Sequence, residues 1–382
     1  MDSGNKLFLL DAYALIYRAY YAFIKNPRIN SKGFNTSAIL GFVNTLEEVL
    51  KKENPTHIGV AFDPAGPTFR HEAFEQYKAQ REETPEAIRL SVPIIKDIIR
   101  AYRIPILEVA GYEADDVIGT LATEAGRQGI TTYMMTPDKD YGQLVSDKVF
   151  MYRPKHTGGF EVMGVEEVKA KFDIQSPAQV IDMLGLMGDS SDNIPGCPGV
   201  GEKTAQKLIS EFGSIENLLE HTDQLKGALK TKVETNREMI TFSKFLATIK
   251  IDVPIQLEMD ALVREEADEN SLRSIFEELE FRTLIDRVLK KDISGNGITS
   301  ATGNKVATGK SAPSPLPLFP EEEGGMQGDL FANFTGNEAG EAKKSNLETL
   351  ETLNCDYQLI DTEKKRAEII QKLLTSKILS LD

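Results

Sequence analysis

The chain has few cysteines, no long apolar run and no excess of basic residues. Its two cysteines, Cys197 and Cys355, lie far apart in the 382 residues, which excludes a disulfide framework and a zinc-binding spacing and fits a reducing compartment. We find no signal peptide and no apolar stretch long enough to span a bilayer, so we expect no membrane partner.

The net charge of −15, from 44 basic and 59 acidic residues, argues by itself against a nucleic-acid partner. Part of the acidic surplus is clustered, however, and bound cations would offset it. Local basic patches can still meet phosphates. The length predicts at least two domains.

The stretch 111–116 carries three carboxylates in four positions, Glu113, Asp115 and Asp116. It follows an apolar run, 104–109, long enough for a strand, and precedes apolar residues at helical spacing. One or two acids at a helix start suit the helix dipole, but three repel one another unless a cation neutralises them. Helix capping and a metal site both remain open for this stretch alone.

Further aspartates follow other predicted strands, and a loop adds two more. They are Asp11 after the strand 7–10, Asp63 after the strand 57–62, Asp138 and Asp140 after the strand 131–135, and Asp189 and Asp192 in the loop. Sites in open α/β sheets form beyond the carboxyl ends of the strands. Any one aspartate there suits a cap or turn, but the joint pattern predicts a site for a hard cation such as Mg²⁺ or Mn²⁺.

The segment 64–85, called here the arch segment, is basic, aromatic and polar. A solvated surface helix and a mobile segment that closes over a phosphate backbone both fit this composition. In the second case Arg70, Lys78 and Arg81 are the cationic contacts, and Lys78 and Arg81 share a helix face because they are three residues apart. Arg18 lies two helical turns after Asp11 and is placed to reach the same site.

A glycine-rich turn, Gly199-Val200-Gly201, opens a predicted helix and is followed by Lys203 and Thr204. Glycines let backbone amides approach a phosphate, and a helix start favours an anion. With helical patterns on both sides, the turn predicts a helix-hairpin-helix that grips a DNA backbone without reading its sequence. The alternative is an ordinary turn between two helices.

Alternating strands and helices predict an α/β fold with a mostly parallel, doubly wound sheet. After this core the pattern becomes helical, then low in apolar residues, then ordered again. The predicted domains are an α/β core with the arch segment at 1–171, a helix-hairpin-helix subdomain at 172–290, a flexible linker at 291–346 and a short segment at 347–382.

Residues 5–290 resemble the flap endonuclease family, in particular the 5′-nuclease domains of bacterial DNA polymerase I, whose sheet core is of the PIN-like, resolvase type. Departures are confined to Tyr141-Gly142 and to Cys197 beside the hairpin, and neither touches a carboxylate. The matching motifs are Leu10-Asp11-Ala12-Tyr13, Phe62-Asp63-Pro64, Phe69-Arg70-His71-Glu72, Tyr77-Lys78-Ala79-Gln80-Arg81, Gly111-Tyr112-Glu113-Ala114-Asp115-Asp116, Asp138-Lys139-Asp140, Gly188-Asp189-Ser190-Ser191-Asp192-Asn193 and Gly199-Val200-Gly201-Glu202-Lys203-Thr204-Ala205.

The resemblance implies a structure-specific 5′ nuclease, a 5′–3′ exonuclease or flap endonuclease of DNA replication and repair. It would be a monomer of the bacterial cytoplasm, acting on flap, nicked or branched DNA, RNA-primed DNA included, with two or more Mg²⁺ or Mn²⁺ ions. By family analogy, one metal position is served by Asp11, Asp63, Glu113, Asp115 and Asp116, and the other by Asp138, Asp140, Asp189 and Asp192.

The same resemblance assigns DNA contacts. Lys78 and Arg81 would neutralise the scissile phosphate, Arg18 and Arg70 would contact phosphates, and Tyr77 would stack on an unpaired base. The turn formed by Gly199, Val200 and Gly201, with Lys203 and Thr204, would hold the duplex, in the family often through a K⁺ ion.

Two alternatives remain at this point. A PIN-type ribonuclease would be shorter and would lack the arch segment and the hairpin, and a silent DNA-binding module would have lost carboxylates. The run 378–382 resembles the first strand of a 3′–5′ exonuclease domain, cut at its first carboxylate. We therefore expect a fragment of a longer polymerase in which only the 5′-nuclease is intact.

Overall fold

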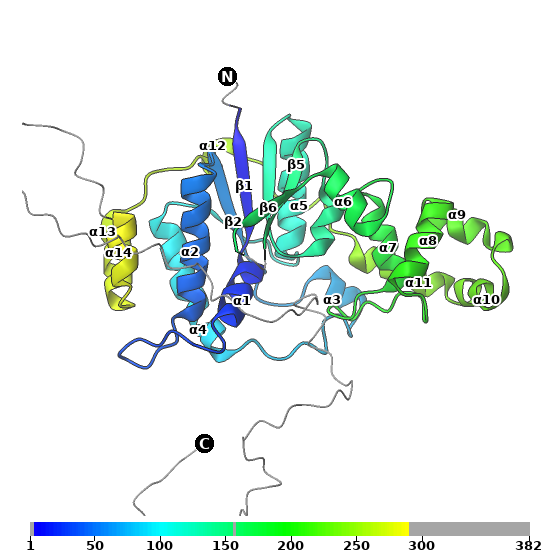
Figure 1. Ribbon diagram of the computed structural model, residues 1–382, viewed down its shortest axis with the longest axis horizontal. Helices are drawn as coiled ribbons and strands as arrows, with labels where there is room; N and C mark the ends of the chain where they lie inside the picture. The colour runs from blue at the N-terminus through cyan, green and yellow to red at the C-terminus, as the bar shows by residue number, and fades with distance from the viewer. Residues whose placement is uncertain (1–3, 156–157, 290–382) are drawn as a thin grey trace, which may run out of the picture. The chain divides into compact units, whose positions relative to one another are not determined.

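A six-stranded sheet organises the computed structural model, which describes residues 4–155 and 158–289 (Figure 1). Its order is β3-β2-β1-β4-β5-β6, with every neighbouring pair parallel except β5 and β6. The mostly parallel sheet predicted from the sequence is confirmed. The strands are β1 (Lys6–Asp11), β2 (His57–Ala61), β3 (Ile106–Leu107), β4 (Thr131–Met135), β5 (Val149–Pro154) and β6 (Phe160–Met163).

Helices follow most of the strands and then continue alone. Those up to residue 172 are α1 (Ala12–Ala22), α2 (Ser37–Lys52), α3 (Phe69–Ala73), α4 (Glu86–Ala101), α5 (Ala114–Arg127), the 3₁₀ helix η1 (Lys139–Leu144) and α6 (Val165–Phe172). Those beyond it are α7 (Gln179–Met187), α8 (Glu202–Phe212), α9 (Ile215–Glu220), the 3₁₀ helix η2 (Thr222–Gln224), α10 (Gly227–Thr235), α11 (Arg237–Ala247), α12 (Met259–Leu262), α13 (Glu269–Glu278) and α14 (Arg282–Leu289). None of the helices in these ranges combines the length and the apolar character that a membrane crossing requires.

The two faces of β1 bury side chains in two different cores, because successive residues of a strand point to opposite sides. Leu7 and Leu9 belong to one core, which also contains the apolar face of α5 and the interior of helices α7 to α12. Phe8 and Leu10 belong to the other core, which contains the apolar faces of α1, α2 and α4. Helices therefore cover both faces of the sheet, as the prediction of a doubly wound fold requires.

The strand order reverses direction between β1 and β4, because the chain runs from β1 outward to β3 and then returns to β4 beside β1. A crevice beyond the carboxyl ends of the strands is expected at such a switch point. Asp11 is the last residue of β1, and Asp138 follows β4 by three residues. The fold thus brings these two aspartates to the same edge of the sheet.

The last helices return to the first half of the chain, where α13 and α14 lie beside α2 and α4 (Figure 1). Phe276 and Leu284 share a core with Phe42 and Ile98, and the backbone N–H of Asp268 donates to the carbonyl of Ala101. The predicted subdomain at 172–290 thus does not stay apart from the sheet core. The boundaries of this subdomain remain a prediction. The packing of α13 and α14 against α2 and α4 refines that prediction.

Three further details differ from the expectations. The third strand is only two residues long, since Pro105 before it cannot donate a ladder hydrogen bond. Strands β5 and β6 were not predicted. The arch segment contains only the five-residue helix α3, and its remainder is irregular. The predicted linker and the segment 347–382 lie outside the described residues.

Candidate active site

Four elements deliver the predicted acids to one edge of the sheet. Asp11 caps α1 by accepting from the Ala14 N–H at 3.1 Å, and Asp138 caps η1 by accepting from the Asp140 N–H at 2.9 Å. Asp63, two residues after β2, accepts from the Ala114 N–H at the start of α5 at 2.7 Å. The helix starts thus orient carboxylates that follow the strands, which is the electrostatic preference of helix N-termini.

Several of these acids repel one another. Burial, and then Asp63, raise the pKa of Asp11 to about 7. Burial and Asp116 raise the pKa of Asp115 well above its usual range, and burial and Asp138 do the same for Asp140. Asp11, Asp63, Asp138 and Asp140 form no ion pair with any described residue. A divalent cation would relieve this repulsion.

Asp140 presents a buried oxygen, Oδ1, that accepts no hydrogen bond from any described residue. Nearly all buried polar atoms in proteins are hydrogen-bonded, so an exception calls for a partner. A carboxylate oxygen is a ligand that Mg²⁺ and Mn²⁺ prefer. This oxygen without a hydrogen-bond donor, called here the orphan oxygen, therefore fits a metal ion. The ion would be bound among the predicted acids at this edge of the sheet, which are called here the acid cluster.

The remaining acids are held by basic side chains. Lys78 Nζ lies 2.7 Å from Glu113, Arg81 Nη2 lies 2.5 Å from Asp192, and Lys139 Nζ lies 2.9 Å from Asp189. Burial acts to raise the pKa of Asp192, but Lys78 and Arg81 outweigh it and lower the pKa to about 2.

Glu113 follows the same balance. Burial acts to raise its pKa, but Lys78 and Arg70 outweigh it and lower the pKa. Among the described residues, no three acids, histidines or cysteines are arranged to hold one metal ion together.

The arch segment is fastened to the loop that carries Asp189 and Asp192. Gln80 donates to the carbonyl of Ser190, the Lys78 N–H donates to the carbonyl of Asp192, and Asn193 donates to the carbonyl of Gln76. Lys78 and Asn193 both have positive φ, at 56° and 58°, which costs of order 1–3 kcal/mol for a residue with a side chain.

Two glycines allow the loop 188–196 to close on itself. Gly188 and Gly196 have φ of 71° and 61°, and a Cβ on Gly188 would lie 2.4 Å from the carbonyl oxygen of Ile194. A side chain at either position would collide with backbone atoms that cannot move aside. The glycines therefore hold Asp189 beside Ile194, with which it exchanges two backbone hydrogen bonds.

The hairpin lies on the helical part of the chain. Gly201 caps α8, whose first turn is closed by the N–H groups of Thr204 and Ala205 on the Gly201 carbonyl. Gly199 and Gly201 are exposed, while Val200 is buried between them. A Cβ on Gly201 would meet only open space, so the backbone there is accessible to a partner. Lys203 is also exposed.

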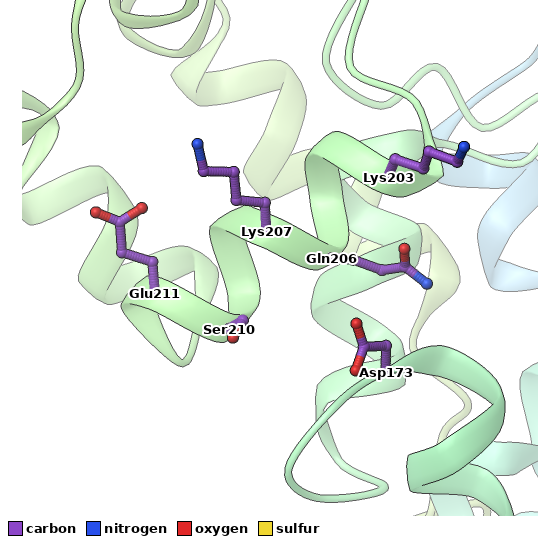
Figure 2. A pocket seen from close by; sticks show the side chains of 6 residues that line it. All are labelled: Asp173, Lys203, Gln206, Lys207, Ser210 and Glu211. Atoms are coloured by element: carbon purple, nitrogen blue, oxygen red, sulfur yellow. The ribbon is translucent and has the colours of Figure 1, made fainter.

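A shallow pocket of about 330 Å³ lies along the same helix (Figure 2). Lys203, Lys207 and Glu211 project from successive turns of α8. Asp173, which follows α6, lies across from Gln206. The pocket has basic and acidic groups on an exposed surface, and it lies away from the acid cluster.

Two sequence predictions require correction. Arg70 was expected to contact DNA, but it is 1% exposed and binds Glu113 and Asp116 through its guanidinium group. Tyr77 was expected to stack on a base, but it is 3% exposed and its hydroxyl donates to Glu113 and Asp192. Amphipathic side chains in a polar segment gave no signal of burial, because their partners are distant in sequence.

Three other basic residues also differ in detail from the predictions. Lys78 and Arg81 both reach the site, but from an irregular turn and not from one face of a helix. Arg18 donates to the carbonyl of Lys155, just beyond β5, at 3.2 Å.

Three residues near the acids were not assigned roles by the sequence. Lys139 pairs with Asp189, and its position between Asp138 and Asp140 was a signal that could have been used. Thr136 and Tyr141 both donate hydroxyl hydrogen bonds to Asp11 Oδ2, at 3.2 and 3.1 Å. Tyr141 had been noted only as a departure from the family motif.

The α/β fold and the acid-lined edge of its sheet define the class of protein to which the chain belongs. Comparison with known proteins supports this assignment. A family model for the N-terminal resolvase-like domain of 5′-3′ exonucleases matches residues 6–173, and one for their C-terminal SAM fold matches residues 175–270. Together these two models span most of the described residues. The chain belongs to the 5′-3′ exonuclease family.

Curated relatives extend beyond this chain. It is 43% identical over 291 residues to DNA polymerase I of Bacillus subtilis, covering 75% of this chain and 33% of that protein. It is 42% identical over 287 residues to DNA polymerase I of Bacillus caldotenax, covering 74% and 32%. The chain thus spans about a third of the length of the curated relatives it matches.

Solved structures share the fold. T5 5′-exonuclease with bound zinc aligns with a TM-score of 0.55 at 21% identity, over 72% of this chain and 99% of that one. The catalytic core of Rad2 in complex with a DNA substrate aligns with a TM-score of 0.52 at 18% identity, over 76% and 93%. At these identities the likeness establishes the arrangement of elements.

Proposed function

We propose that the chain is a structure-specific 5′ nuclease that hydrolyses phosphodiester bonds of branched DNA with the help of Mg²⁺ or Mn²⁺. The observation that carries the proposal is the meeting of two kinds of group. Carboxylates from β1, β2, β4 and the start of α5 gather at one edge of the sheet, and Lys78 and Arg81 reach them from the arch segment. Acids suit metal ions, and the adjoining cations suit a phosphate.

The metal ligands in this proposal are the acids that lack a close cationic partner. The orphan oxygen of Asp140 and the raised pKa values of Asp11 and Asp115 support this choice. Bound there, a pair of divalent ions would lower the pKa of water and neutralise a leaving oxygen. The residues proposed as direct ligands are Asp11, Asp63, Asp115, Asp138 and Asp140.

The paired acids have a conditional role. Glu113, Asp189 and Asp192 become available when Lys78, Lys139 and Arg81 turn to a phosphate or are displaced by a metal. Asp116 differs from them, because both of its oxygens bind the buried Arg70. We therefore assign Asp116 a role in positioning its neighbours and not in ligation.

Lys78 and Arg81 are proposed to hold the scissile phosphate. Opposing carboxylates outweigh burial and raise the pKa of Lys78, so it is charged at neutral pH. Each residue now neutralises a carboxylate at the acid cluster, and exchanging that carboxylate for a phosphate oxygen keeps the charge paired. Such an electrostatic group stabilises the charge that develops in the transition state.

The hairpin at 199–201 is proposed to hold the duplex arm through exposed amides, with Lys203 and Thr204 beside it. Its backbone is open to solvent at Gly201. A K⁺ ion bound at the hairpin is part of the proposal. However, the Gly199 carbonyl already accepts from Lys232 Nζ at 3.2 Å, so a cation there would compete with this ammonium group.

The wider role follows the curated relatives, which are DNA polymerases I. We propose that the chain removes primers and flaps during DNA replication and repair, acting as a monomer in the bacterial cytoplasm. RNA at the 5′ end is included as a substrate of the same site.

The test is cleavage of a 5′-labelled flap duplex at saturating enzyme, with Mg²⁺ or with EDTA. Linear duplex and single-stranded RNA of matched sequence are the controls. The proposal expects Mg²⁺-dependent cutting at the flap junction and slower cutting of both controls. Preferred cutting of single-stranded RNA would instead support the ribonuclease alternative. Binding to the flap without cutting in any metal would support a silent DNA-binding module.

A further inference from the structure

We infer that Arg70 and Ser243 set the register of cleavage, by fixing the separation between the DNA-holding hairpin and the acid cluster. The inference rests on the proposed function and deepens it. Two groups of contacts, one at each end of a stretch of α11, carry the argument. Neither residue is proposed to touch DNA or metal, so both are positioning residues.

The first group surrounds the Arg70 guanidinium, which uses its donors on two separate parts of the chain. Nε donates to the Leu246 carbonyl at 2.9 Å, and Nη2 donates to the Thr248 carbonyl at 2.8 Å. Nη1 and Nη2 also bind the two oxygens of Asp116 at 2.8 and 2.9 Å. Arg70 therefore joins the end of α11 to the first turn of α5, where the acid cluster begins.

Asp116 strengthens this junction from the other side. Its Oδ1 accepts from the Lys250 N–H at 2.7 Å, and its Oδ2 accepts from the Glu113 N–H at 3.1 Å. Asp116 is fully buried and Arg70 nearly so. The guanidinium group of Arg70 is a buried planar fork of donors bonded to both oxygens of one carboxylate, so it has little freedom to shift.

The second group ties α11 to the hairpin. Ser243 is fully buried, and its hydroxyl accepts from the Gly196 N–H at 2.9 Å. Gly196 lies three residues before Gly199, and the next residue, Cys197, donates its N–H to the Leu186 carbonyl of α7. The approach to the hairpin is thus fastened to two helices of the helical part.

The two groups are separated by a rigid spacer. Ser243 and Leu246 lie three residues apart on α11, which corresponds to about 4.5 Å along a helix axis. No loop intervenes between the contact to the hairpin and the contact to Arg70. A duplex held at the hairpin is therefore held at a set distance from the acids, which selects the phosphate that reaches them.

Weakening either contact should change which phosphodiester bond is cleaved, in addition to slowing the cleavage. Arg70→Lys keeps the charge but loses the fork, and Ser243→Ala removes the tie to Gly196. The experiment is single-turnover cleavage of one labelled flap duplex with Mg²⁺ at saturating enzyme, with product lengths resolved to one nucleotide. Thermal unfolding of each variant establishes that it is folded at the assay temperature.

Wild-type enzyme is expected to give one dominant product. Arg70→Lys should lower the rate roughly 10²-fold, the scale of a misplacement near 1 Å, and should increase several-fold the share of products cut at neighbouring phosphates. Ser243→Ala should change the product pattern in the same direction by a smaller amount. The pattern distinguishes positioning from general destabilisation, because destabilisation lowers the amount of active enzyme without moving its cut.

The matched control is Lys244→Met on the same helix, whose ammonium pairs with Asp182 at 2.6 Å and Glu216 at 2.9 Å. It should keep the wild-type product pattern. Folded Arg70→Lys and Ser243→Ala enzymes that make only the wild-type product would overturn the inference. If Arg70→Lys does not fold, the product pattern of Ser243→Ala decides. A wild type that does not cut the flap would overturn the proposed function itself.

Discussion

The acid cluster contains two kinds of carboxylate that differ in their partners. Glu113, Asp116, Asp189 and Asp192 each lie within 3.1 Å of a basic side chain, whereas Asp11, Asp63, Asp138 and Asp140 pair with none of the described basic residues. Both kinds lie in adjacent motifs, and Asp115 and Asp116 are neighbours in sequence. Composition and proximity therefore do not determine their roles.

This difference in partners separates acids whose charge is neutralised by the protein's own basic side chains from acids that require a cation from solution. A buried pair is weak evidence for added stability, but removing one partner leaves a buried charge and costs about 3–5 kcal/mol. An unpaired buried carboxylate instead raises the free energy of the folded state until a metal binds. On this account Arg70 and Asp116 maintain the shape of the site, and Asp138 and Asp140 hold the metal.

The largest expected effect comes from removing an acid that is proposed as a direct metal ligand. Asp138→Asn or Asp115→Asn should abolish detectable flap cleavage, because a ligand to the metal is lost. Affinity for the flap duplex should stay within a few-fold, since the hairpin and arch segment, and not this acid, are proposed to hold the DNA. Turnover with Mg²⁺ and fluorescence anisotropy, measured in parallel, check both statements. Near-normal turnover by either variant would show that the residue is not a ligand.

The next largest effect concerns the cation that pairs with Glu113. Lys78→Ala should lower the single-turnover rate by roughly 10²-fold, the scale of losing one electrostatic contact in a transition state. Lys139→Ala serves as the comparison, because it also frees an acid but is not proposed to hold the scissile phosphate. A full rate for Lys78→Ala at saturating enzyme would reduce Lys78 to a binding contact.

The unpaired acids should also affect stability in opposite directions with and without metal. In EDTA, Asp140→Asn should stabilise the fold by up to about 1 kcal/mol, since it removes a repelled charge at a functional site. In Mg²⁺ the order should reverse, because wild-type protein gains about 2.7 kcal/mol at a concentration 100 times the Kd. Thermal unfolding in both buffers is the measurement. A destabilised variant in EDTA would contradict the repulsion.

A smaller effect is expected away from the acids, at the hairpin. Gly201→Val should weaken binding to the duplex arm and flatten the salt dependence of affinity, because a side chain would stand between the exposed amides and a phosphate. Cleavage at saturating enzyme should change little. Anisotropy over a series of salt concentrations checks this. An unchanged salt slope would remove the hairpin from the DNA interface.

The smallest effect tests a paired carboxylate far from the site. Burial acts to raise the pKa of Glu53, but hydrogen bonds from Lys6 and Tyr152 outweigh it and lower the pKa. The stability contributed by a lowered pKa is present above the unfolded value, near 4.5, and is lost as the pH falls through the folded value.

Glu53→Gln should therefore cost less than about 1 kcal/mol at pH 7, because the pair is partly exposed. The difference from wild type should shrink below pH 4.5. Denaturant unfolding at pH 7 and at a pH below 4.5 measures this difference. A difference that is equal at the two pH values would show that the Glu53 charge does not contribute.

Much of the fold was accessible from the sequence, because local patterns determine it. Strand β4 spans the residues predicted for it, 131–135. Strand β5 was missed although turn residues flank it, Ser146-Asp147 before it and Gly158-Gly159 after it. The return of α13 was not predictable, because the spacing of Leu272 and Phe276 indicates a helix but not the surface it covers.

The gathering of the acids at one edge of the sheet was predictable, and the partners of their side chains were not. Helix starts and strand ends located the acids, since those positions have a local signature. The hydrogen-bond partners of these acids were not predictable, because they come from segments that are distant in the sequence. Arg70 meets Leu246 across 176 positions, and Tyr77 meets Asp192 across 115. Nothing near Arg70 in the sequence distinguishes a buried fork from a phosphate contact.

The most direct test of the two kinds of carboxylate is calorimetric titration of DNA-free protein with Mn²⁺, comparing Asp140→Asn with Asp116→Asn. Thermal unfolding in EDTA first shows that each variant is folded. The account predicts that Asp140→Asn weakens Mn²⁺ binding more than Asp116→Asn does, because the first variant loses a proposed direct ligand and the second disturbs only a residue that positions ligands, an effect of roughly 10–100-fold. Equal losses in the two variants, or a larger loss in Asp116→Asn, would contradict it.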